Sequence, residues 1–256
     1  MYIHGGRDLK EGPVQTMWRL NLTETLAMEN DASLQCFWES VKPNGKGPKR
    51  VSYHDSVMVS PTMVAFYGGL YEGNEDCNTI WALNLEKNAW SQLSFGQCDD
   101  ILPRDDFALA TNSADMSSFY VFGGFVKGSR VEDLIKFSCD GPKLDGDCLV
   151  KGEEGIESKM PVRNSTSAFL HENKIWVFGG QDDDNNKLCD LWCCDLATPG
   201  WSQVCPAEGE FWPCPRSGHT SVMWNDKMYL FGGIYELTKE LGDLCVFDLK
   251  TQKFSG

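Results

Sequence analysis

Five short segments of this 256-residue chain end in a pair of glycines, and they constrain the fold more than any other feature. In each segment a run of aromatic and β-branched residues precedes the pair, which favours a short buried strand that stops where only glycine fits or turns. The intervals between the pairs are 63, 55, 56 and 53 residues. The chain is therefore predicted to be a repeat protein. The pairs are Gly5-Gly6, Gly68-Gly69, Gly123-Gly124, Gly179-Gly180 and Gly232-Gly233.

A large side chain follows each glycine pair at a nearly constant distance. It lies 12 residues after the second glycine in four repeats, at Trp18, Trp81, Trp192 and Cys245, and 11 residues after it in the third, at Ile135. Nine residues later a second aromatic residue follows in three repeats, at Trp90, Trp201 and Phe254. We expect Trp38 to take this place in the first repeat, and the third repeat has none. These tryptophans are expected to pack between neighbouring repeats.

Two glycines, an aromatic residue about 12 positions on and another about nine beyond it resemble the kelch repeat, and the resemblance spans essentially the whole chain. It implies an all-β fold of the β-propeller type, in which each repeat forms a four-stranded blade. No linker or shift in composition marks a second domain. We expect one domain, residues 1–256, with repeats at approximately 1–48, 49–102, 103–161, 162–214 and 215–256.

The first repeat lacks a piece that the others have. In the kelch pattern an inner strand follows an arginine and precedes the Gly-Gly strand, as expected after Arg50, Arg104, Arg163 and Arg216, whereas the first repeat starts at its Gly-Gly strand. The last repeat stops just past its outer strand, so five blades are expected to form an open ring. Because native sheets avoid bare edges, we expect either a longer natural chain with the missing strand and a sixth blade, or a partner over the gap.

Two stretches depart from the repeat. Residues 23–30 favour a helical turn or a loose loop, and residues 43–48 favour a turn-rich connector. The tail of the third repeat, from Gly141 to Gly155, is polar, charged and rich in glycine. It predicts an exposed excursion in place of a regular outer strand.

Acidic residues outnumber basic ones by 37 to 23, which gives a net charge of −14. Such a surface repels a phosphate backbone, so no nucleic-acid partner is expected. No apolar run is long enough to span a bilayer, and Met1 opens directly into a strand rather than a signal segment. We therefore expect no membrane association and a cytoplasmic location, with a cytoskeletal or ciliary assembly as the alternative.

The 11 cysteines and four histidines give no metal or catalytic motif. The cysteine count is odd, most cysteines fall in predicted strands, and neither Cys-x-x-Cys nor a zinc spacing occurs, so buried free thiols are expected. In Pro215-Arg216-Ser217-Gly218-His219 the resemblance implies a structural, hydrogen-bonding histidine, and His54 shares its place in the second repeat. No nucleophile elbow or phosphate loop appears. No catalytic residue, metal or cofactor is therefore expected.

The arginines before the inner strands are the first candidates for partner binding. Repetition would place Arg50, Arg104, Arg163 and Arg216 around one mouth of the central channel. The resemblance implies that arginines here bind acidic or C-terminal peptide segments, and a planar guanidinium group suits carboxylates. The alternative is that they brace neighbouring blades. The loops after the glycine pairs would form the outer rim of this surface, with Arg7, Tyr71, Arg130, Asp182, Asp183, Asp184 and Tyr235.

The acidic run Asp182-Asp183-Asp184 is a solvated loop in the simplest interpretation, and the alternative is that it binds a basic partner segment. The whole pattern predicts a non-enzymatic protein-interaction module or scaffold. A substrate receptor of a ubiquitin ligase shares the same surface chemistry. A kelch-like metalloenzyme is a third hypothesis, and a structural subunit of a cytoskeletal or ciliary assembly is a fourth.

Overall fold

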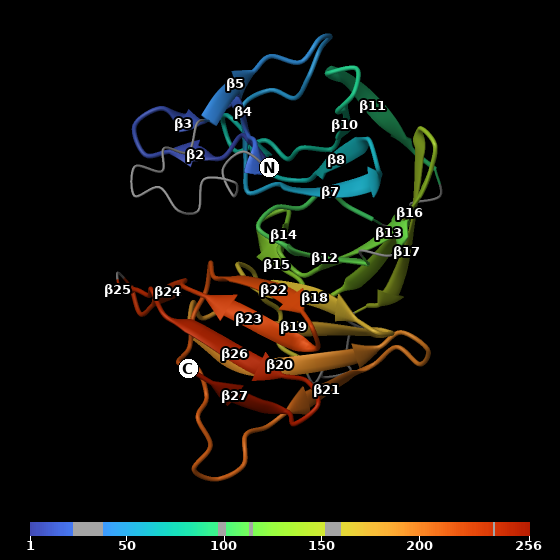
Figure 1. The fold of residues 1–256 in the computed structure, drawn as a ribbon. Helices are drawn as coiled ribbons and strands as arrows, with labels where there is room; N and C mark the ends of the chain where they lie inside the picture. Colours follow the sequence, from blue (N-terminus) through green and yellow to red (C-terminus); the bar gives the residue numbers. More distant parts are fainter. Residues whose placement is uncertain (23–37, 97–100, 113–114, 152–159, 238) are drawn as a thin grey trace.

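The computed structural model describes residues 1–22, 38–96, 101–112, 115–151, 160–237 and 239–256. Every secondary-structure element that it gives in full is a β-strand, from β1 to β27. The predicted all-β fold is confirmed. Most of the strands form five consecutive antiparallel sheets, here called blades 1 to 5 (Figure 1). The turn expected within residues 23–30 lies outside the described residues.

Blade 1 has three strands, and blades 2 to 5 have four each, in the order inner, second, third and outer. Blade 1 consists of β1 (Tyr2–His4), β4 (Met17–Leu20) and β5 (Trp38–Val41). Blade 2 consists of β7 (Asp55–Ser60), β8 (Met63–Tyr67), β10 (Ile80–Asn84) and β11 (Ala89–Phe95). Blade 3 consists of β12 (Ala108–Asn112), β13 (Asp115–Phe122), β16 (Leu134–Asp140) and β17 (Lys143–Val150). Blade 4 consists of β18 (Ser167–His171), β19 (Lys174–Gln181), β20 (Lys187–Asp195) and β21 (Trp201–Val204). Blade 5 consists of β22 (Thr220–Trp224), β23 (Lys227–Phe231), β26 (Leu244–Asp248) and β27 (Lys253–Ser255).

The inner strands of neighbouring blades lie next to one another and so surround the axis of the propeller.

The remaining strands form small two-stranded sheets beside the glycine pairs. The small pairs are β2 (Arg7–Asp8) with β3 (Gly12–Pro13), β6 (Val51–Ser52) with β9 (Leu70–Tyr71), β14 (Phe125–Val126) with β15 (Ser129–Arg130), and β24 (Ile234–Tyr235) with β25 (Lys239–Glu240).

The glycine pairs fall at the ends of the second strands, as the repeat predicts, and they are required there. Both glycines of each pair have positive φ, for example 64° at Gly123 and 89° at Gly124, a conformation that L-residues with a side chain rarely adopt. A Cβ atom at Gly123 would lie 2.7 Å from the carbonyl oxygen of Arg163 in the next blade. The backbone N–H of Gly124 donates to that same oxygen at 2.9 Å. The pair therefore lets adjacent blades approach closely.

The register of the outer strands confirms the place predicted for Trp38. It pairs with Leu20 of the third strand of blade 1. The outer aromatic residues of three other blades occupy the same register, in the pairs Leu83 with Trp90, Cys194 with Trp201 and Phe247 with Phe254.

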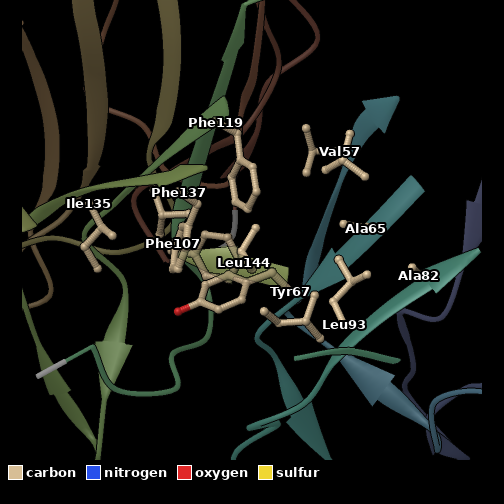
Figure 2. Packing of buried hydrophobic residues seen from close by; sticks show 13 residues of the cluster. Val57, Ala65, Tyr67, Ala82, Leu93, Phe107, Phe119, Ile135, Phe137 and Leu144 are labelled. Carbon is tan, nitrogen blue, oxygen red and sulfur yellow. The ribbon is translucent and has the colours of Figure 1, made fainter. Parts of the chain in front are cut away.

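The core lies between the blades. Figure 2 shows the cluster between blades 2 and 3, where Ala65, Ala82 and Leu93 of blade 2 face Phe119 and Phe137 of blade 3. Side chains alternate between the two faces of each sheet. Blades 2, 3 and 4 therefore each contribute to two interfaces, one with the preceding blade and one with the following blade.

Blade 4 shows this alternation in adjacent cysteines. Cys193 packs toward blade 5 and Cys194 toward blade 3, so the two thiols point to opposite faces as expected. Burial raises the pKa of Cys193 to about 11. The nine cysteines in the described part of the chain are free thiols.

The tryptophans of the third strands differ in burial. Trp81 and Trp192 are 6% and 5% exposed, packed against the preceding blade as predicted. Trp18 has the same place in blade 1 but is 39% exposed, since no preceding blade packs on it within the described residues.

The excursion expected at the end of the third repeat is wrong in its first part. Residues 143–150 form the regular outer strand β17. Leu144 is fully buried between blades 2 and 3, and Gly146 leaves room for Phe137, which would lie 2.9 Å from an added Cβ. The strand also pairs in parallel with β11, through Ser94 and Phe95, and joins blades 2 and 3 into one eight-stranded sheet. These contacts hold a strand whose outward side chains are polar.

Blade 1 lacks an inner strand, as predicted, and no β-pairing links it to blade 5 among the described residues. The open faces at the two ends of the arc expose apolar side chains. They include Ile3, Trp18 and Trp38 on blade 1 and Val222, Trp224, Phe231 and Leu244 on blade 5. A sixth blade or a partner over this gap stays a prediction, which the size and unfolding cooperativity of residues 1–256 in solution would test.

Candidate interaction surface

One end of the propeller, here called the loop face, is formed by the segments between each glycine pair and the following third strand. These are residues 7–16, 70–79, 125–133 and 182–186, together with the described residues 234–237 and 239–243. Near them a chain of backbone hydrogen bonds links blades 2 to 5 where each inner strand is entered. Asp106 N–H donates to Tyr53 at 3.0 Å, Ser165 to Asp106 at 3.1 Å, and Gly218 to Ser165 at 2.8 Å.

Three of the four predicted arginines lie inside the blades. Arg104, Arg163 and Arg216 are 1%, 0% and 0% exposed. Each guanidinium group binds the carboxylate that opens the third strand of its own blade through two nitrogens, as Arg163 does with Asp190 at 2.7 and 2.9 Å. The same group donates to the carbonyl of the first glycine, Gly179, at 2.9 Å. The other two arginines bind in the same way.

These ion pairs change the titration of the aspartates. Burial alone would raise the pKa of Asp190, but the hydrogen bond and charge of Arg163 outweigh it and hold the pKa below its usual value. At Asp243 the hydrogen bond from Arg216 is the largest cause of a lowered pKa. The arginines therefore have charged partners within their own blades, whereas the alternative interpretation was that they brace neighbouring blades. Their expected exposure to a partner is corrected for Arg104, Arg163 and Arg216.

Arg50 is a different case, because it does not occupy the repeated arginine position. Val51 does: its carbonyl accepts from the N–H of Gly6 at 3.0 Å, as the carbonyl of Arg163 accepts from Gly124. Val51 is 3% exposed. Thr79 stands where blades 3 to 5 have the aspartate, so blade 2 lacks both members of the ion pair. Arg50 is exposed and makes no hydrogen bond or ion pair within the described residues.

The aspartate partners were missed by the sequence reasoning, although a signal exists. Asp133, Asp190 and Asp243 each precede a leucine at the start of the third strand. They follow their arginines by 29, 27 and 27 residues. An arginine and an aspartate that recur together at one spacing indicate a pair within the repeat.

Arg130 connects the loops of blades 3 and 4. Its Nε donates to Asn164 Oδ1 at 2.6 Å, and its Nη2 donates to Asn185 Oδ1 at 2.8 Å. Asp183 lies 3.7 Å away, and the guanidinium carbon is 4.8 Å from the ring centre of Phe125. The structure thus gives Arg130 a structural set of contacts on the rim, and its role toward a partner stays a prediction.

The acidic run lies in the loop between β19 and β20. Asp182 organises this loop, because its carboxylate accepts from the backbone N–H of Asn186 at 2.8 Å. Asp183 and Asp184 are exposed. The carboxylate of Asp184 has no ion-pair partner among the described residues, whereas that of Asp183 is exposed but lies 3.7 Å from Arg130.

The other rim residues are dispersed. Arg7 is exposed on the β2–β3 hairpin. Tyr71 is half-buried and accepts a hydrogen bond from Cys77 Sγ at 3.0 Å; burial, followed by this contact, raises the pKa of Tyr71 to about 12. Tyr235 is half-buried with Lys239 Nζ 5.6 Å from its ring centre. The structure does not bring these three together in one cluster.

His219 has the structural role that the family pattern implies. Its Nε2 donates to the carbonyl of Phe178 in blade 4 at 3.1 Å. Burial, with a smaller effect of the Arg216 charge, lowers the pKa of His219 to about 4. In blade 2 the equivalent His54 instead lies 3.5 Å from His4, and burial lowers the pKa of both to about 4.

A cavity of about 410 Å³ lies between blades 1 and 2. Met17, Val41 and Trp90 provide apolar walls, and Lys42 and Arg50 are its cationic residues. Elsewhere, within the residues described, no three histidine, cysteine or acidic side chains converge as a metal site. The described part of the chain also contains no helix with the length and apolarity needed to cross a membrane.

Comparison with known proteins agrees with this geometry. The sequence model of the KLHDC2/KLHL20/DRC7 Kelch-repeats domain matches residues 1–143 and 117–256, and so covers the chain from end to end. The chain belongs to the kelch-repeat family. Kelch-repeat propellers are generally non-enzymatic modules for protein–protein interaction.

Curated relatives share this domain in longer proteins. The chain is 28% identical to the leucine-zipper-like transcriptional regulator 1 homolog of Drosophila melanogaster, over 98% of this chain and 25% of the relative. It is 27% identical to human host cell factor 2, over 83% of this chain and 28% of the relative. It is also 27% identical to bovine kelch domain-containing protein 3, over 97% and 62%. The chain thus spans from a quarter to under two thirds of the length of these relatives.

Proposed function

We propose that this kelch domain is a non-enzymatic interaction module that binds a partner protein at its loop face, through a segment that carries basic residues. The observation that carries the proposal is the location of charge. The guanidinium groups of Arg104, Arg163 and Arg216 are neutralised inside the blades, while Asp183 and Asp184 are exposed at the rim.

Other exposed carboxylates make the loop face more negative. Glu72, Glu75 and Asp76 lie in the loop of blade 2, and Glu236 and Glu240 in that of blade 5. A face with this charge, on a chain of net charge −14, attracts and orients a cationic partner at long range, and salt weakens the attraction. The partner chemistry proposed here is thus opposite to that expected from four exposed arginines.

The test is quantitative binding to a partner first isolated by affinity capture with the full natural protein. Replacing Asp183→Asn together with Asp184→Asn removes two rim charges, one of which lies 3.7 Å from Arg130, and leaves the residues of the blade strands unchanged. We expect the association rate to fall by about threefold or more at low salt, because rim charges act on encounter, and the difference to shrink at high salt. The matched control is Asp140→Asn with Asp147→Asn, two exposed carboxylates on the outer hairpin of blade 3. Equal rates for both double variants would overturn the proposal.

A second candidate site is favoured by one observation: Arg50, which has no hydrogen-bond or ion-pair partner among the described residues, lines the cavity between blades 1 and 2. An acidic or C-terminal peptide segment would place its carboxylate at Arg50 and Lys42 and an apolar side chain against Met17 or Trp90. The test is Arg50→Ala against the exposed control Arg7→Ala. Loss of affinity by tenfold or more in Arg50→Ala alone would move the binding site from the loop face to this cavity. The partner's identity also tests the ubiquitin-ligase and cytoskeletal hypotheses.

A further inference from the structure

Equivalent residues lie where the loop of one blade meets the entry to the next blade. Between blades 3 and 4 they form an attractive contact, whereas between blades 2 and 3 both are acidic. Between blades 3 and 4, Arg130 from one loop reaches Asn164 at the start of the next blade, with Nε 2.6 Å from Oδ1. The side chain of Arg130 is only 9% exposed. A guanidinium group thus fills the space between the loop of blade 3 and the entry to blade 4.

Blades 2 and 3 place two acids at the equivalent positions. Asp76 pairs with Leu70, the residue after the glycine pair, as Arg130 pairs with Phe125. Asp105 follows the buried Arg104 and forms a β-bridge with Phe125 in the loop of its own blade. Asn164 follows Arg163 and forms the equivalent β-bridge with Gln181. The register that brings a cation to an amide in one interface therefore brings a carboxylate to a carboxylate in the other.

Asp105 has no compensation for its burial. It is 8% exposed, and its carboxylate has no hydrogen-bond or ion-pair partner among the described residues. Burial, followed by the negative charges of Asp106 and Asp76, raises the pKa of Asp105 to about 6. The neighbouring Asp106 differs, because its carboxylate accepts hydrogen bonds from Asn164 and Ser165. A carboxylate on a residue that is 8% exposed, with a second acid nearby and no hydrogen-bond or ion-pair partner among the described residues, has the chemistry of a cation site.

We propose that Asp105 and Asp76 form a subsite that takes the arginine or lysine side chain of the partner segment bound at the loop face. The inference rests on the proposed function and specifies which partner group binds, and where. A guanidinium group fits best, since Arg130 already occupies the equivalent space and a planar donor group can bridge two carboxylates. A divalent cation fits less well, because no third ligand joins these two among the described residues.

The direct test uses a small probe and the isolated chain. Acetyl-Gly-Arg-Gly-amide is titrated against the protein at pH 7 and low salt, and the carboxyl carbon of Asp105 is followed by NMR. We expect saturable binding and a fall of about one unit in the pKa of Asp105, which corresponds to a tenfold preference of the probe for the ionised carboxylate. The same peptide with citrulline, which is nearly isosteric but uncharged, should bind at least tenfold more weakly.

Two variants fill or remove the site. Asp76→Arg copies the residue of the next blade, and it should bind Asp105 internally, lower the pKa of Asp105 without any probe and abolish probe binding. Asp105→Asn should also abolish probe binding, and it keeps the proposal testable if the first variant fails to fold. Asp140→Asn, an equal change of charge at an exposed site, should bind the probe as the parent does. Equal binding of the citrulline peptide, or unchanged binding by Asp105→Asn, would overturn the proposal.

The isolated partner separates this inference from the proposed function. If Asp105→Asn leaves partner affinity unchanged while Asp183→Asn with Asp184→Asn weakens it, the subsite is wrong and the loop face is right. If neither changes partner binding, both the proposed function and the subsite for the partner fail, even where the arginine probe still binds at Asp105. Partner affinity that falls tenfold or more in Asp105→Asn supports both.

Discussion

Blades 4 and 5 each pair a phenylalanine with a leucine at the same register, yet these two side chains are buried in blade 4 and exposed in blade 5. Phe178 and Leu191 of blade 4 are fully buried, whereas their equivalents in blade 5, Phe231 and Leu244, are 51% and 53% exposed. The backbone shows the same contrast. Gly180 N–H donates to the carbonyl of Arg216, but Gly233 N–H has no backbone partner in the described residues.

The difference teaches that burial in a propeller belongs to the interface rather than to the residue. Phe178 is buried because Met228 and Leu230 of blade 5 pack on its blade. Phe231 has the equivalent place in blade 5, but no following blade packs on it within the described residues. A pattern of alternating apolar residues predicts two apolar faces for every blade, and only the neighbours decide which faces are covered.

The largest difference in the free energy of unfolding is expected between variants at Trp192 and Trp18, which occupy the same place in blades 4 and 1. Trp192→Ala should lower the free energy of unfolding by about 3–5 kcal/mol, because it empties a packed site between blades 3 and 4. Trp18→Ala should cost less than about 1 kcal/mol, since that side chain is 39% exposed on an open face. Chemical denaturation of both variants measures the contrast. A Trp192→Ala variant within about 0.5 kcal/mol of the parent would remove that residue from the core.

The free energy lost when an ion pair is broken should also differ between blade 4 and blade 5. The carboxylate side chain is 16% exposed at Asp190 but 45% exposed at Asp243, where no following blade covers it. Asp190→Ala should cost about 3–5 kcal/mol, because it leaves Arg163 buried and unpaired. Asp243→Ala should cost less than Asp190→Ala, since water already reaches the carboxylate of Asp243, although Arg216 is 0% exposed like Arg163.

Blade 2 provides the control for these ion pairs. Arg163→Val combined with Asp190→Thr copies its Val51 and Thr79 into blade 4 and leaves no buried charge. We expect this double variant to be more stable than Asp190→Ala alone, as replacements of whole buried pairs often are. A double variant that is less stable than the single one would show that the pair itself, rather than its completeness, holds the blade.

A smaller effect is expected on the pH dependence of the free energy of unfolding, through His219 at the interface of blades 4 and 5. The pKa of His219 is lowered to about 4 in the folded chain, against 6.5 as the ordinary value. The unfolded chain therefore binds the proton first, and stability is lost as pH falls from about 6.5 toward 4. Between pH 7.5 and 5 this histidine should account for about 2 kcal/mol.

The comparison is made with His219→Gln, which keeps a donor toward the carbonyl of Phe178 but does not titrate. Urea denaturation at several pH values should give this variant a flatter profile than the parent. His4 and His54 still titrate in both proteins, so only the difference between the two profiles reports on His219. Identical profiles would mean that His219 is not buried as described.

Much of the fold could be predicted because the repeat is written five times. The glycine pairs, the outer-strand place of Trp38 and the opposite faces of Cys193 and Cys194 all follow from register alone. The outer strand β17 could not be recognised from its composition, since glycine and aspartate disfavour strands. Its alternation of Leu144 and Gly146 inward with Asp145 and Asp147 outward was the available signal.

The interaction surface was harder to predict, because repetition gives a position but not its environment. Placing Arg50 with the other three arginines was wrong by one residue, and Val51 holds the repeated position. The burial of Arg104, Arg163 and Arg216 depends on aspartates almost 30 residues away. The unfilled pair of Asp76 and Asp105 arises only where two blades meet, so neither repeat shows it alone.

The parallel pairing of β11 with β17 has a consequence for how the chain opens. Blades 2 and 3 share hydrogen bonds at their outer edges as well as a common core, whereas blades 4 and 5 are separate sheets, joined by packing and by hydrogen bonds near the loop face. Amide hydrogens of Ser94 and Gly96, which donate to the carbonyls of Pro142 and Leu144, can exchange with solvent only when both blades loosen together. In native-state hydrogen exchange the second and third repeats should behave as one foldon, while the fourth and fifth exchange as two.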